Sequence, residues 1–345
     1  MAVSGNGPER VSTEQLRDIR VLIPSSRDVY RLVSYGMVID FEDAVVDASD
    51  VDLVPVPIYS RRERARRLAQ RRRFVRAPRQ HYDVCLLIAM APYWVPSLRY
   101  VRGLREIADR VVVYLFDSWV SELPDLARDR RTWSLVDDLF VSFRHSLPDY
   151  ADQLSCRVHY LPQAIDPRWF EPKKGKRPID VLSVGRRLPA VHEQLREVCQ
   201  RRDQFYLYQT HAAPQAMDFR ENQELLGQLC RSARVHVSWR VDRTNPARAG
   251  EGEAITARWF ESAASGAAVI GAAPPGAEFE RLFPYPEFVR QIAPDSAGDT
   301  ESVLDEALAD GDDTGRWALA EHVRSTHTWG RRWREIVSVC GLCRL

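Results

Sequence analysis

The chain alternates short apolar runs, rich in β-branched residues, with longer amphipathic stretches. The runs lie at residues 19–23, 51–56, 83–89, 111–116, 139–142 and 157–161, and again at 179–184, 204–208, 234–239 and 267–271. Runs of this length that are apolar throughout are typical of strands buried on both faces, and the stretches between them are long enough for crossover helices. The pattern predicts an α/β protein with doubly wound parallel sheets that are covered by helices on both faces.

The two groups of runs predict two domains, and 345 residues are enough to give each its own core. Residues 167–178 contain the lysines of the chain and several prolines but no apolar period, so we expect an exposed interdomain linker. The expected division is a flexible polar lead-in over 1–16, an N-terminal domain over 17–166, a C-terminal domain over 179–315, and a helix over 316–345 that packs across both domains. Such sheets bind ligands at the carboxyl ends of their strands, so function is expected in a central cleft between the domains.

Charge is nearly balanced over the whole chain, with 49 Lys+Arg against 48 Asp+Glu and a net charge of +1. This balance gives no overall field that would attract nucleic acid, which is not expected as a partner. The cations are nevertheless unevenly placed, because residues 61–79 carry a dense run of arginines. Three interpretations of this run stay open: a solvated helix face, a contact with an anionic membrane surface, and, with least support because no recognised motif accompanies it, a nucleic-acid contact.

Neither a secretory signal nor an apolar stretch of membrane-spanning length is found, so we expect a cytoplasmic protein. The six cysteines lie mostly in apolar patterns and are interpreted as reduced thiols, including the closely spaced Cys340 and Cys343. The glycine-rich phosphate motifs of dehydrogenases and ATPases are missing. Asp50 and Asp52 form an isolated Asp-x-Asp pair that we interpret as a turn, and neither a metal site nor another cofactor is expected.

The most informative segment is GEGEAITARWFESAASGAAVIGAAPPG, residues 250–276. Glu253 and Glu261 are separated by seven residues, and small residues lead from the second glutamate to Gly266 and the following strand. Two further blocks, LPQAIDPRWF and IDVLSVGRR, precede this segment. Together the three blocks resemble the GT-B glycosyltransferases of the retaining group 1, or family-4, type, including their spore-maturation-like members.

The resemblance implies two Rossmann-like domains facing a central cleft, with the acceptor held by the N-terminal domain and a nucleotide diphosphate sugar held by the C-terminal domain. By this resemblance, Glu253 lies near the hydroxyls of the donor sugar as a catalytic residue, and Glu261 accepts hydrogen bonds from the ribose. Arg186, at the end of the IDVLSVGRR block, is expected to bind the donor diphosphate and to take part in catalysis, because a guanidinium binds phosphate oxygens in a bidentate manner.

The family places a lysine a few residues after this arginine, and the sequence has none there. Other arginines are therefore candidates for the second phosphate contact. A helix that opens near residue 254 is expected to direct free backbone N–H groups toward the phosphates. The remaining donor-side candidates are Gly185, Arg187, His211, Arg240, Arg243, Ala254, Ile255, Thr256 and Arg258.

Candidates in the N-terminal domain rest on their position after strand-like runs. Asp117 follows the run at 111–116 and is expected to contact sugar hydroxyls or to act as a catalytic base, with a helix cap as the structural alternative. No motif assigns the acceptor site. Its candidates are Ser25, Ser26, Arg27, Tyr93 and His145.

The resemblance implies a bacterial enzyme of carbohydrate or natural-product glycosylation that moves a sugar from a nucleotide diphosphate to an acceptor hydroxyl, with retention and without a divalent metal. Two alternatives stay open. One is a nucleotide-sugar epimerase of the same architecture, and the other is a non-catalytic protein that docks to a membrane or a partner through residues 61–79. The identity of the donor and the acceptor and the oligomeric state are not predicted.

Overall fold

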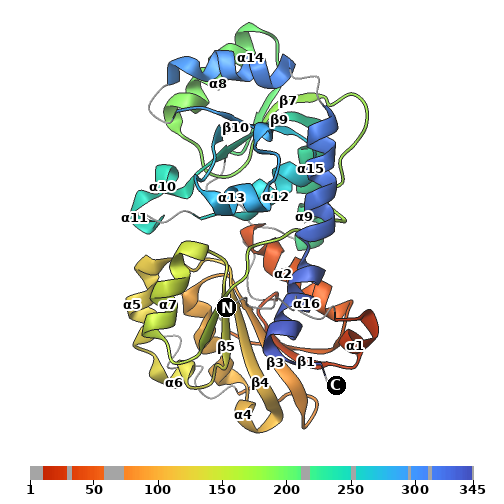
Figure 1. The fold of residues 1–345 in the computed structure, drawn as a ribbon, viewed down its shortest axis with the longest axis vertical. Helices are drawn as coiled ribbons and strands as arrows, with labels where there is room; N and C mark the ends of the chain where they lie inside the picture. Colours follow the sequence, from red (N-terminus) through yellow and green to blue (C-terminus); the bar gives the residue numbers. More distant parts are fainter. Residues whose placement is uncertain are drawn as a thin grey trace, which may run out of the picture.

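The computed structural model describes residues 11–28, 33–57, 74–210, 218–249, 254–293, 297–309 and 313–343. It contains two α/β domains, each built on a parallel sheet, and Figure 1 shows them stacked along the long axis of the molecule. The predicted α/β class with two parallel sheets is confirmed. Within the described residues, no helix is long and apolar enough to cross a membrane.

The N-terminal sheet has the strand order β2-β1-β3-β4-β5-β6, and its neighbouring strands run parallel. Its strands are β1 (Arg20–Ser25), β2 (Asp50–Pro55), β3 (Tyr82–Ala89), β4 (Ala108–Leu115), β5 (Asp138–Val141) and β6 (Arg157–Tyr160). The central strands β3 and β4 are almost wholly buried, which explains why their sequences are continuous apolar runs. The winding direction reverses between β1 and β3, so a crevice opens at the carboxyl ends of these strands.

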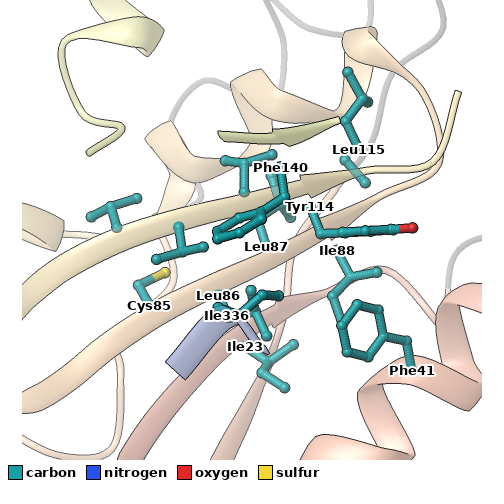
Figure 2. Close-up of a cluster of buried hydrophobic side chains, with 14 of the residues drawn as sticks. Ile23, Phe41, Cys85, Leu86, Leu87, Ile88, Tyr114, Leu115, Phe140 and Ile336 are labelled. Carbon is teal, nitrogen blue, oxygen red and sulfur yellow. The ribbon is translucent and has the colours of Figure 1, made fainter. Parts of the chain in front are cut away.

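Helices cover this sheet and complete its core. They are α1 (Thr13–Arg17), α2 (Gly36–Val46), α4 (Leu104–Ile107), α5 (Leu123–Ala127), α6 (Arg130–Trp133) and α7 (Leu147–Gln153), with the 3₁₀ helices η1 (Val33–Tyr35), η3 (Pro92–Tyr100), η4 (Val120–Glu122) and η5 (Arg144–Ser146). Phe41 of α2 is fully buried, and its ring meets the edge of Tyr114 with the ring centroids 5.2 Å apart. Figure 2 shows Phe41 among the aliphatic side chains of β1 and β3, including Ile23 and Ile88.

The C-terminal sheet has the strand order β11-β10-β9-β7-β8, again with parallel neighbours. Its strands are β7 (Ile179–Ser183), β8 (Tyr206–Tyr208), β9 (Ala233–Trp239), β10 (Ala268–Ala272) and β11 (Val289–Gln291). Its helices are α8 (Pro189–Arg201), α9 (Phe219–Ser232), α10 (Val241–Thr244), α11 (Pro246–Ala249), α12 (Ala257–Ala264), α13 (Ala277–Leu282), α14 (Thr300–Ala309) and α15 (Asp313–Thr326), with the 3₁₀ helices η6 (Pro286–Phe288) and η7 (Ala297–Asp299). The strand β11 is absent from the prediction because it is short and contains Arg290 and Gln291, so it lacks an apolar run.

Gly271 lets β10 approach β9 closely. Its φ is +144°, and a Cβ atom there would lie 1.8 Å from the backbone oxygen of Ser238. We expect Gly271→Ala to lower the free energy of unfolding by about 2–3 kcal/mol, because a backbone atom cannot move away as a flexible side chain can. Urea denaturation measures this loss. Gly330→Ala is the matched control, since a Cβ atom at Gly330 in the last helix meets nothing within 4 Å and is expected to be tolerated.

The expectation of one C-terminal helix over 316–345 is wrong, because two helices occupy this segment. The helix α15 packs on the C-terminal core, and α16 (Trp329–Cys340) packs on the N-terminal core through Trp329, Trp333 and Ile336. Between them the backbone pairs with Ile165: the Ile165 N–H donates to the His327 carbonyl (3.0 Å), and the Trp329 N–H donates to the Ile165 carbonyl (3.2 Å). This pairing ends α15, and Thr328 caps the next helix. Figure 1 shows α16 lying beside α2 in the N-terminal domain.

Two boundary expectations also differ from the structure. The lead-in over 1–16 is not polar coil to its end, because α1 begins at Thr13 with a capping box, and Leu16 is buried. The linker over 167–178 is not exposed throughout, because Phe170 is buried in the C-terminal core and the indole N–H of Trp169 donates to Asp40 of α2 (3.1 Å). The beginning of the linker is therefore a packed part of the domain boundary.

Candidate functional site

The carboxyl end of β4 and a short excursion of the C-terminal domain meet at the domain boundary. Asp117 lies two residues beyond β4, and its backbone N–H donates to the Met90 carbonyl (2.9 Å) at the end of the neighbouring strand. The excursion consists of α10 and α11, residues 241–249, which Figure 1 shows above the loops of the N-terminal domain. Arg248 of this excursion pairs with the Asp117 carboxylate at 3.1 Å. A carboxylate from one domain is therefore neutralised by the other.

Arg186 is the second cation that acts on Asp117. It follows β7 in a loop that turns at Gly185, whose φ of +94° favours glycine, and whose N–H donates to the side-chain oxygen of Gln209 (3.2 Å). Burial raises the pKa of Asp117, while Arg248 and Arg186 oppose this rise. Desolvation lowers the pKa of Arg186, while Asp117 opposes that change. The structure thus brings together two residues expected at the site, Asp117 and Arg186.

A cavity of about 250 Å³ lies between the domains. Ser142, His145 and Tyr160 line it from the N-terminal domain, and Ile255 and Glu278 line it from the C-terminal domain. The phenol of Tyr160 donates a hydrogen bond to Glu278 across the boundary (2.6 Å). Hydroxyl, imidazole and carboxylate groups beside an aliphatic wall can bind a hydroxyl-rich ring.

Helix α12 carries the second glutamate of the motif. Thr256 is its N-cap in extended conformation, so the helix opens where the sequence predicts, and Gly266 (φ +67°) follows its end. Glu261 lies within this helix, almost fully buried, with Arg258 at 2.5 Å. Burial raises the pKa of the Glu261 carboxyl, and Arg258 opposes the rise. Ala254 precedes the helix and belongs to an interdomain apolar cluster with Trp119.

Three other expected phosphate-binding arginines have partners within the C-terminal domain. Arg187 contacts His192 (3.1 Å) and lies over the Tyr208 ring, with 5.5 Å to the centroid. Arg240 and Arg243 both pair with Asp242, at 2.8 and 3.7 Å. The candidates Glu253 and His211, and the arginine run over residues 61–73, lie outside the described residues.

The acceptor-side candidates after β1 are held in an ionic network. The Ser25 hydroxyl donates to Glu42 of α2 (2.8 Å), and Arg27 contacts Glu42 (2.7 Å) and Asp43 (3.0 Å). Burial raises the pKa of Glu42 to about 7 even though Arg27 opposes the rise. Ser26 is buried beside them. These groups therefore bind the loop to α2, and none of them lines the cavity described above.

Tyr93 is also outside that cavity. Its phenol lies 3.3 Å from the Tyr35 phenol, whereas His145 lines the cavity and stacks on Phe143. Sequence reasoning missed Arg248, Tyr160 and Glu278. Tyr160 lies at the end of the predicted run 157–161 but was not singled out, and Arg248 and Glu278 follow no apolar run directly, so the meeting of the domains is what reveals all three.

Two groups of carboxylates among the described residues could be considered as metal ligands, and both lie away from the cleft. The ligand atoms of His81, Asp83 and Asp109 lie within 4.8 Å of one another, but at the amino ends of β3 and β4, opposite the cleft. Asp50 and Asp52 both pair with Arg79. They begin β2, so interpreting them as a turn was wrong.

The comparisons with known proteins agree with this architecture. Residues 191–338 match the model of a family described as glycosyl transferase-like, which covers α8 to most of α16. No curated protein matches the chain. Sucrose-phosphate synthase from Thermosynechococcus elongatus has a similar structure, with a TM-score of 0.55 and 11% identity over 94% of this chain and 98% of that chain. An alpha-glucosyltransferase in complex with UDP has a TM-score of 0.54 and 11% identity over 94% of this chain and 100% of that chain.

A second structure of an alpha-glucosyltransferase, in complex with UDP and DNA, gives a TM-score of 0.53 and 10% identity over 94% of this chain and 100% of that chain. At such identities the likeness concerns the fold alone. It extends over both domains, and it confirms the predicted GT-B arrangement of two Rossmann-like domains.

Proposed function

We propose that this chain, which has the GT-B fold, is a glycosyltransferase that moves a sugar from a nucleotide diphosphate to an acceptor hydroxyl at the boundary of its two domains, with retention and without a metal. The glycosyl transferase-like match over residues 191–338 supports sugar transfer. The observation that carries the proposal is the meeting of Asp117, Arg186 and Arg248 where the carboxyl ends of both sheets face each other. Doubly wound sheets bind their ligands at such crevices.

The chemistry proposed for this site is stabilisation of charge as the donor bond breaks. Departure of the nucleoside diphosphate develops negative charge, which Arg186 and the N–H groups at the start of α12 stabilise. The sugar left behind is oxocarbenium-like and positive, and the Asp117 carboxylate stabilises it. Cations held in place by the protein perform the task that a metal ion performs in other transferases. Transfer in the presence of a chelator is therefore expected.

The cavity, which Asp117, Arg186 and Arg248 do not line, is proposed to hold a hydroxyl-rich ring of the acceptor. His145 and Tyr160 give it polar groups from the N-terminal domain, and Ile255 connects it to the start of α12. A ring in this cavity would lie between the proposed donor domain and the acceptor domain. Contact between the domains excludes water and so limits hydrolysis of the donor.

Glu261→Ala tests the donor site. The buried carboxylate is proposed to accept the ribose hydroxyls, so its loss is expected to weaken nucleotide binding about 10- to 100-fold. Calorimetric titration with UDP, GDP and ADP, followed by transfer assays with the corresponding sugars, measures this effect. Glu224→Ala is the control, because Glu224 is exposed on α9 and accepts only from Gln228 among the contacts described.

The same assays separate the alternatives. If no nucleotide or nucleotide sugar binds the wild-type protein, the proposed function fails. An altered sugar that forms without any acceptor would indicate an epimerase. Nucleotide binding with no turnover of any donor would favour the non-catalytic alternative.

A further inference from the structure

The excursion over residues 241–249 is anchored on the N-terminal domain by more than one kind of contact. Val241 and Ala249 of the excursion form an apolar cluster with Trp119 and Phe143 of the N-terminal domain. The Ser121 hydroxyl donates to the Arg248 carbonyl (2.9 Å). Apolar burial and a side-chain hydrogen bond to its carbonyl therefore fix the backbone of Arg248 independently of the charge of its side chain.

The guanidinium of Arg248 contacts only N-terminal groups among its described partners. It pairs with Asp117 at 3.1 Å and with Glu122 of η4 at 3.2 Å. Its carbon Cζ lies over the Trp119 ring, 5.4 Å from the centroid. The planar guanidinium is thus held between a ring and two carboxylates, a geometry that a lysine ammonium cannot reproduce.

Both cations that face Asp117 come from the other domain. Arg248 belongs to α11 and Arg186 to the loop after β7, whereas the groups that act on Asp117 from its own domain, Trp119 and Tyr150 of α7, bring no positive charge. A desolvated carboxyl without a counter-charge takes up a proton. Arg248 and Arg186 therefore favour the ionised form of Asp117 in the contact between the two domains, where its side chain is only 22% exposed.

We propose that Arg248 is a positioning residue that orients the Asp117 carboxylate and keeps it ionised in the site between the two domains. This inference rests on the proposed function, in which Asp117 acts as a carboxylate.

Steady-state kinetics of Arg248→Gln and Arg248→Lys as a function of pH test the proposal, with the nucleotide sugar that the wild type turns over. Asp117 works as a carboxylate, so activity falls as the pH drops through its pKa. Loss of a cation raises that pKa, and the acid limb of the Arg248→Gln profile is expected to move up by about 1–3 pH units. The Arg248→Lys variant restores the positive charge but not the planar contacts of the guanidinium. Its acid limb is therefore expected to lie between those of the wild type and Arg248→Gln, with kcat reduced.

Arg220→Gln is the matched control. Arg220 of α9 pairs with Asp43 of α2 at 2.9 Å, so this variant also removes an ion pair between the domains, but one that does not touch Asp117. Its acid limb is expected to coincide with that of the wild type. An Arg248→Gln limb that stays in place, or an equal shift in the Arg220 variant, would overturn the inference.

A measurement without turnover keeps this test separate from the proposed function. The difference in unfolding free energy between the wild type and Asp117→Asn changes with pH at the pKa of Asp117. Repeating the comparison in the Arg248→Gln background is expected to move that pH upward. The same midpoint in both backgrounds would contradict the proposal even if no sugar donor is turned over.

Discussion

Trp329→Ala is expected to lower the free energy of unfolding by about 3–5 kcal/mol, because a large cavity would open where the C-terminal helix meets the N-terminal core. Trp329 is buried to 1% exposure. Its ring stacks on Phe41 with the centroids 4.9 Å apart and meets Phe116 at 5.2 Å. Urea denaturation followed by circular dichroism measures the loss. In this variant, the transition at the lowest urea concentration is expected to be the unfolding of the N-terminal domain.

Trp317→Ala is the control for this substitution. Trp317 lies on α15, is only partly buried, and has Lys174 over its ring at 5.8 Å. Its removal is expected to cost about 1 kcal/mol or less. Equal losses for the two tryptophans would contradict the assignment of Trp329 to the N-terminal core.

The central strands of this fold could be predicted because parallel strands that are buried on both faces are apolar at nearly every position. The prediction of residues 83–89 corresponds to β3, Tyr82–Ala89, for this reason. The same rule misses β11, whose three residues are paired only with β10 at the edge of the sheet. The break between α15 and α16 could not be predicted either. It depends on backbone hydrogen bonds that His327 and Trp329 make with Ile165, which lies far away in the sequence.

The site could be predicted only in part. Asp117 and Arg186 follow strands, so their place at the carboxyl edge of a sheet was predictable from the sequence. Arg187 has the same sequence signal as Arg186, but the structure places it against His192 and Tyr208. Arg248 has no such signal, because its role depends on a contact between domains. The sequence pattern thus predicts which residues lie at the carboxyl edge of a sheet, but not which of them contact residues of the other domain.

Asp117→Asn is expected to lower kcat about 10²- to 10³-fold while leaving the affinity for the nucleotide sugar within a few-fold of the wild type. The carboxylate is proposed to stabilise charge that exists only in the transition state, and removal of one such group typically has this effect. Asparagine keeps the size of the side chain. Single-turnover kinetics, and calorimetric titration with whichever of UDP, GDP and ADP the wild type binds, separate the chemical step from binding.

Glu122→Gln is the sharpest comparison, since Glu122 shares Arg248 with Asp117. If the carboxylates of Asp117 and Glu122 matter only because they hold the domains together through Arg248, Asp117→Asn and Glu122→Gln will lose activity to the same extent. If Asp117 itself faces the reacting sugar, Glu122→Gln will lose less than about tenfold, because the Arg248 pair with Asp117 at 3.1 Å persists. Asp117 and Glu122 both bind Arg248 and so both contribute to the contact between the domains. Asp117 is the one of the two whose negative charge acts on Arg186. A small effect of Asp117→Asn on kcat, with nucleotide binding intact, would remove Asp117 from the proposed mechanism.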